Sequence, residues 1–131
     1  MMKTKTISVS IQCKPGKVYN YASKPENLPK WAGAFCLSVK KSGRDWIIET
    51  PEGPMKIAFA PQNEFGVLDH YVTLSPGVVI YNPMRVIPNG YGSEITFTLF
   101  QQPSMSEKQF KRDMVMVRKD LNTLKKILEG T

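Results

Sequence analysis

The last quarter of the chain carries an apolar stripe at helical spacing, and this stripe limits what the chain can fold into. Its members recur in steps of four and three residues: Phe110, Met114, Val117, Leu121, Leu124 and Leu128. Ser106 is placed to cap the first turn, with Gln109 completing a capping box, and Gly130 is placed to end the helix in a left-handed conformation. We therefore predict a helix over residues 106–130, roughly 35 Å long. A helix with one apolar face of this length needs a broad apolar surface to lie on.

The first third of the chain predicts one strand followed by two short helical segments. Residues 4–12 alternate in polarity, with Ile7, Val9 and Ile11 on the buried side. Pro15 suits the first turn of a helix that ends near Ser23. The proline-rich residues 24–31 favour one further helical turn, which inserts Leu28 and Trp31 into the core.

From residue 35 to residue 102 the apolar period is two, which is typical of strands. We expect strands over residues 35–41, 46–50, 55–59, 67–74, 78–86 and 93–101, with the clearest hairpin signal at 88–91. A turn at Glu52–Gly53 would pair Thr50 with Met55, Ile48 with Ile57 and Trp46 with Phe59. Pairing Leu74 with Val78 would set Val72 opposite Ile80 and His70 opposite Asn82. Together with the first strand, this predicts an α+β fold in which a curved antiparallel sheet of about seven strands wraps around the long helix.

This layout resembles the helix-grip fold of the START-like superfamily, also called SRPBCC. Pro15-x-x-Val18-Tyr19-x-Tyr21 and residues 25–31 (PENLPKW) look like its characteristic first third, and residues 65–70 (FGVLDH) and 83–90 (PMRVIPNG) look like polyketide-cyclase-like bacterial members. The resemblance covers residues 1–131 and implies a single domain. It also implies a cavity between helix and sheet, but no fixed catalytic motif, so no catalytic residue is assigned from it.

Strand parity predicts which side chains would line such a cavity. The predicted ligand-binding residues are Trp31, Phe35, Trp46, Met55, Phe59, His70, Asn82, Met84, Phe97, Phe110, Met114 and Val117. Methionine and aromatic side chains can adapt to a ligand. The alternative interpretation is that these side chains simply fill a core.

Two polar residues interrupt this apolar surface. His70, the only histidine, lies between Leu68 and Val72, and the expected register places Asn82 opposite it. The two side chains could satisfy each other, anchor a ligand hydroxyl or carbonyl, or provide acid–base chemistry through His70. Asp69 is not expected to orient the imidazole, because adjacent strand residues point to opposite faces.

The chain's net charge of +7 does not predict nucleic-acid binding, because the lysines and arginines are scattered. Their densest group is expected on the solvent face of the last helix, interspersed with Glu107, Asp113, Asp120 and Glu129. No apolar run approaches the ~20 residues of a membrane span, and no signal peptide is recognised, which predicts a cytoplasmic protein.

Other site chemistries find no support in the residues. We interpret Cys13 and Cys36 as free thiols, and one histidine with two distant cysteines predicts no metal site. The absence of a phosphate loop, dinucleotide fingerprint or G-x-S-x-G motif predicts no cofactor.

The sequence thus favours a domain that binds a small, largely apolar molecule, such as a lipid, an aromatic or a polyketide-like compound. The alternatives are a cyclase or dehydratase that uses His70 as acid or base, and a packed module that acts through protein contacts. The sequence specifies neither the ligand nor the oligomeric state.

Overall fold

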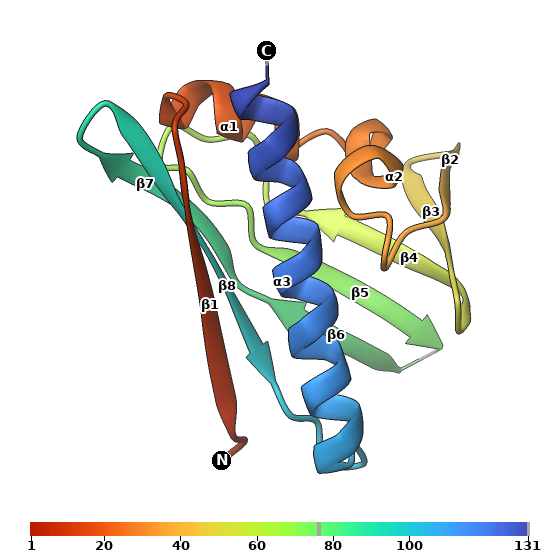
Figure 1. Ribbon diagram of the computed structural model, residues 1–131. Helices are drawn as coiled ribbons and strands as arrows, with labels where there is room; N and C mark the ends of the chain where they lie inside the picture. The colour runs from red at the N-terminus through yellow and green to blue at the C-terminus, as the bar shows by residue number, and fades with distance from the viewer. Residues whose placement is uncertain (76, 131) are drawn as a thin grey trace.

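A computed structural model describes residues 1–75 and 77–130, and it shows the predicted α+β helix-grip architecture (Figure 1). In the figure, α3 crosses one face of the strands and starts beside the beginning of β1. The elements follow in the order β1 (Thr4–Ile11), α1 (Pro15–Ala22), the 3-10 turn η1 (Pro25–Asn27), α2 (Leu28–Trp31), β2 (Ser38–Ser42), β3 (Asp45–Thr50), β4 (Gly53–Phe59), β5 (His70–Ser75), β6 (Val78–Asn82), β7 (Met84–Asn89), β8 (Gly92–Phe100) and α3 (Glu107–Glu129).

The strands form two antiparallel groups that meet at Pro83. One group has the order β1-β8-β7 and the other β2-β3-β4-β5-β6. We predicted a single strand over residues 78–86, but Pro83 divides it into β6 and β7. Proline has no N–H to donate to a ladder, although the Pro83 carbonyl still accepts a hydrogen bond from the Thr98 N–H (2.9 Å). The described chain therefore has eight strands where about seven were expected.

The β3–β4 hairpin departs from its predicted register by two residues. Thr50 pairs with Gly53, so Ile48 lies opposite Met55 and Trp46 opposite Ile57. The cause is the turn: the Thr50 hydroxyl donates to the Gly53 carbonyl (2.8 Å) and accepts from the Glu52 N–H (3.1 Å). A shift of two residues leaves every side chain on its predicted face.

The β5–β6 hairpin confirms the pairings on which the candidate site depends. His70 lies opposite Asn82, and Val72 lies opposite Ile80. The predicted pairing of Leu74 with Val78 is wrong, because a register irregularity between residues 73 and 75 brings Ser75 opposite Val78. The β5 strand also starts later than predicted.

Glycine is required at position 66, just before β5. Gly66 has a φ of 72°, and a Cβ built on it would lie 2.1 Å from the Val86 carbonyl oxygen. Its backbone instead approaches β7 closely enough for the Val86 N–H to donate to the Gly66 carbonyl (3.0 Å).

The two ends of α3 are capped in different ways. The Ser106 side chain accepts a hydrogen bond from the Gln109 N–H (3.1 Å), as predicted, but the Gln109 side chain donates to Asp113 rather than reaching back to the cap. Gly130 has a φ of −82°, so the predicted left-handed end is wrong. The helix ends instead with the Gly130 N–H bonded to the Lys126 carbonyl.

The apolar face of α3 is buried unevenly. Phe110, Leu121, Leu124 and Leu128 are fully buried in the core. Met114 and Val117 are only half-buried against it. The helix packs along β1 and β8 and touches α2, and the stretch that carries Met114 and Val117 is its less buried part.

Candidate functional site

The structure divides the twelve predicted ligand-binding residues into two groups. Trp31, Met55, His70, Met84 and Phe110 are buried. Seven are half-buried: Phe35, Trp46, Phe59, Asn82, Phe97, Met114 and Val117. Five of the residues predicted to line a cavity are therefore core residues, and the other seven keep part of their surface exposed.

A row of neighbouring residues crosses the inner side of the strands. Phe59 pairs with His70 across β4 and β5, and His70 pairs with Asn82 across β5 and β6. The His70 ring lies 5.1 Å from the Phe59 ring and 5.6 Å from the Phe97 ring, measured between centroids. We call these four residues, Phe59, His70, Asn82 and Phe97, the inner row.

His70 occupies the centre of the inner row and has a fixed tautomer. Its Nδ1 lies 3.0 Å from the Leu68 carbonyl oxygen. A carbonyl oxygen can only accept, so Nδ1 carries the proton and donates it. Burial lowers the pKa of His70 below its usual value, which keeps the ring neutral. A neutral imidazole protonated at Nδ1 presents an acceptor lone pair at Nε2.

Neither His70 Nε2 nor the Asn82 amide has a hydrogen-bond partner within residues 1–75 and 77–130. The two side chains thus do not satisfy each other, although they lie opposite one another. Nor are these atoms sealed off: of the described side chains, only Trp31 has a fully buried nitrogen or oxygen atom without a partner, its Nε1. The inner row therefore offers two reachable polar groups in apolar surroundings.

Trp31 and Phe35 lie on α2 and the connection to β2, away from the inner row in sequence. This region is held to α3 by Asp120, whose carboxylate accepts a hydrogen bond from the Ala34 N–H (3.1 Å). Burial raises the pKa of Asp120 to about 6. Asp120 is only 6% exposed, so the expectation that it lies on the solvent face of the helix is wrong.

Asp113 also departs from that expectation. It is half-buried, accepts a hydrogen bond from the Gln109 side chain (2.8 Å), and has its pKa raised chiefly by burial. The spacing of both carboxylates in the sequence indicates the apolar face of the helix. Asp120 follows Val117 by three residues and precedes Leu124 by four, and Asp113 has the same spacing from Phe110 and Val117.

The outer side of the strands carries a separate polar cluster around Asp69. Arg85 donates two hydrogen bonds to the Asp69 carboxylate (2.9 Å each), and the Tyr81 hydroxyl donates a third (2.8 Å). The Arg85 hydrogen bonds hold the pKa of Asp69 near 2. As predicted, Asp69 points away from His70 and cannot orient its ring. Sequence reasoning did not identify this cluster.

The cysteines offer no activated nucleophile. Both are free, and Cys36 is buried with its thiol donating to the Ser38 carbonyl (3.3 Å). Burial, reinforced by the nearby Asp120 charge, raises the pKa of Cys36 to about 11, which disfavours the reactive thiolate. No three His, Cys, Asp or Glu side chains gather as metal ligands in the described part of the chain. None of its described helices is both long and apolar enough to cross a membrane.

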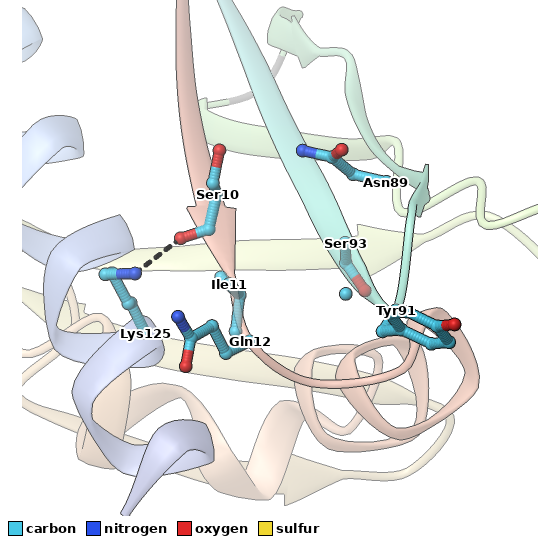
Figure 2. A pocket seen from close by; sticks show the side chains of 8 residues that line it. Ser10, Ile11, Gln12, Asn89, Tyr91, Ser93 and Lys125 are labelled. Atoms are coloured by element: carbon cyan, nitrogen blue, oxygen red, sulfur yellow. Dashed lines mark hydrogen bonds between the residues drawn. The ribbon is translucent and has the colours of Figure 1, made fainter.

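Two surface hollows lie away from the inner row. The first is lined by Ser10, Ile11, Gln12, Asn89, Tyr91, Gly92, Ser93 and Lys125 (Figure 2). Its one charged side chain, Lys125, is already paired: Lys125 Nζ donates to the Ser10 carbonyl (2.7 Å) and to Glu129 (2.7 Å). The second lies between α1 and the end of α3. Since none of the twelve predicted residues lines either hollow, we assign the candidate site to the inner row on the basis of its unpaired polar groups.

Comparison with known proteins identifies the fold. No protein-family model matches the sequence, and no curated protein does either. Solved structures do match. XoxI from Bacillus cereus is 18% identical, with a TM-score of 0.78 over 97% of this chain and 96% of its own. Ara h 8.0201 is 11% identical, with a TM-score of 0.76 and full coverage of both chains.

A third match, DynU16, is a protein in the dynemicin biosynthetic locus. It is 13% identical with a TM-score of 0.73, and the match spans 96% of this chain and 47% of DynU16. At such low identities the similarity concerns the fold alone. The chain has a helix-grip fold, as its sequence pattern predicted.

Proposed function

We propose that this helix-grip domain binds a small, largely apolar molecule between the inner row and α3, against Met114 and Val117. The observation that carries the proposal is the pair of unpaired polar groups, His70 Nε2 and the Asn82 amide, among half-buried apolar side chains. Ligand sites commonly combine an apolar lining with a few such groups.

The physical case rests on what these residues lack. A bound apolar molecule would separate these two groups from water, and a buried polar group left without a partner costs about 1–3 kcal/mol. A ligand that itself supplies the hydrogen-bond partners avoids that cost. It also removes apolar surface of Phe59 and Phe97 from water, at about 25 cal/mol for each Å². Met114 can adjust its rotamer to the shape of the ligand.

The proposal is tested with Nile red, an uncharged dye whose fluorescence rises in apolar surroundings. We expect the protein to enhance its fluorescence in a saturable titration. Met114→Lys should abolish the enhancement by placing a charge on the half-buried face of α3. Val115→Lys is the matched control, because Val115 lies on the same helix with 69% of its surface exposed.

Thermal unfolding of both variants would show that they remain folded. Equal enhancement by the Met114→Lys and Val115→Lys variants would contradict the proposed location. No enhancement by the unmodified protein would contradict the proposed function and favour a packed module. Native mass spectrometry followed by solvent extraction would then identify any molecule that copurifies with the chain.

A further inference from the structure

Resting on the proposed function, the geometry points to a ligand class: an apolar molecule with a neutral hydroxyl group, which donates to His70 Nε2 and accepts from the Asn82 amide. The same arrangement discriminates against carboxylates. The inference follows from the directions in which the two side chains can donate and accept hydrogen bonds.

His70 sets the first requirement, a donor on the ligand. The Leu68 carbonyl already receives the Nδ1 proton (3.0 Å), so a neutral ring has only an acceptor left at Nε2. The ring is 6% exposed and lies between the Phe59 and Phe97 rings, which opposes a second proton. A ligand carbonyl or ether oxygen at this point would face the Nε2 lone pair without a hydrogen between them.

Asn82 sets the second requirement, an acceptor close to that donor. Its position opposite His70 places the two Cβ atoms roughly 5 Å apart. The Asn82 NH₂ group can donate. One hydroxyl oxygen at about 3 Å from each side chain can therefore donate to His70 and accept from Asn82. A hydroxyl is the smallest neutral group that satisfies both.

Charge strengthens the discrimination against carboxylates. The inner row contains no lysine or arginine that could pair with an anion. Arg85 on β7 does not supply this charge, because its guanidinium donates two hydrogen bonds to Asp69 on the outer side of the strands. On the helix, the buried Asp120 and the half-buried Asp113 are acidic, and the half-buried Lys125 is already hydrogen-bonded to Ser10 and Glu129. A carboxylate could accept from Asn82, but it would face the Nε2 lone pair and would find no cation among the inner-row residues to pair with.

Three ligands with the same ring system test the inference by isothermal titration calorimetry at neutral pH. 2-Naphthol can donate and accept, 2-methoxynaphthalene can only accept, and 2-naphthoate is an anion that can only accept. We expect 2-naphthol to bind roughly tenfold more tightly than either of the others, the value of one hydrogen bond of about 1.4 kcal/mol.

Variants then locate the preference. His70→Phe should bring the affinity ratio of 2-naphthol to 2-methoxynaphthalene to about one, since it removes the acceptor and keeps an aromatic ring. Asn82→Leu should reduce the ratio as well. Tyr71→Phe is the matched control: Tyr71 is the next residue on β5, lies on the outer side, and should leave the ratio unchanged.

The outcomes separate the inference from the proposed function. Equal affinity for the three ligands, or tightest binding of 2-naphthoate, would overturn the inference and leave the proposed function standing. Binding of Nile red without binding of 2-naphthol would overturn the inference too. If neither Nile red nor any naphthalene binds, the proposed function itself fails.

Discussion

The two halves of α3 carry the same apolar repeat but meet different surroundings. In the C-terminal half, Leu121, Leu124 and Leu128 are at most 4% exposed. In the N-terminal half, Phe110 is 1% exposed at the start of the helix, but Met114 and Val117 after it are only half-buried. The polar groups differ in the same way: the carboxylate of Asp120 is paired with a backbone N–H, whereas His70 and Asn82 have unpaired polar atoms within the described residues.

The difference shows that a helical stripe does not by itself decide between a core and a binding surface. Along β1 and β8 the helix is in contact with the strands, and near its middle Asp120 ties it to the connection after α2. In the inner row, Phe59, Asn82 and Phe97 stay half-buried beside the buried His70. What lies opposite the stripe, rather than the stripe itself, sets the role of each half.

The largest effect should come from truncating a buried side chain in the C-terminal half of α3. Leu124→Ala removes a side chain with 0% exposure and should lower the free energy of unfolding by about 3 kcal/mol. Met114→Ala removes a half-buried side chain and should cost about 1 kcal/mol or less. Urea unfolding of the two variants measures the contrast. Equal losses would show that the two halves are packed alike.

A smaller effect should come from the paired carboxylate of Asp120. Its folded pKa of about 6 lies above the unfolded value of 3.8, so the folded state holds the proton more tightly. Its contribution to stability is full below the unfolded pKa and is lost as the pH rises through 6. Asp120→Asn keeps the acceptor for the Ala34 N–H and removes the charge, and should stabilise the protein at mildly alkaline pH by about 1–2 kcal/mol.

The matched variant Asp120→Ala removes the charge and the acceptor together, leaving the Ala34 N–H unpaired. It should be less stable than Asp120→Asn at every pH. Chemical unfolding across the acidic to alkaline range measures both. If Asp120→Asn is destabilising and keeps the pH dependence of the unmodified protein, the carboxylate is not buried as described.

The smallest effect should come from His70, with the opposite sign. Burial lowers its folded pKa below the unfolded value of 6.5, so the unfolded state binds the proton more readily. The corresponding stability is present above pH 6.5 and is lost as the pH falls toward the folded pKa. His70→Gln should flatten the stability profile on the acidic side of 6.5 only. A profile unchanged by this substitution would mean that the imidazole is solvated.

Much of the fold was accessible from the sequence because its determinants are local. The period-two pattern predicted the strands, and the Ser106 cap predicted the start of α3. The pairing of His70 with Asn82 followed from the spacing of the β5–β6 hairpin. The β3–β4 register was missed because the Thr50 side chain, not the Glu52–Gly53 pair, organises that turn. The side chains of β3 and β4 were still assigned to the correct faces, because a register shift of two residues leaves each side chain on the same face.

The site was less accessible because its decisive contacts are tertiary. Asp120 was assigned to solvent because its partner, the Ala34 N–H, lies 86 residues away in the chain. The tautomer of His70 depends on a nearby carbonyl, that of Leu68, but the burial that keeps the ring neutral comes from Phe59 and Phe97 on other strands. Periodicity places a residue on a face and does not say what its polar atoms meet there.

The imidazole nitrogens of His70, the only histidine in the chain, test the central claim most directly through long-range ¹H–¹⁵N NMR correlation at neutral pH. We predict a neutral ring protonated at Nδ1, with an unprotonated Nε2 whose resonance shifts when 2-naphthol is added and not when 2-methoxynaphthalene is added. A ring protonated at Nε2, or one whose Nε2 resonance responds to neither compound, would contradict an open acceptor at the centre of the inner row.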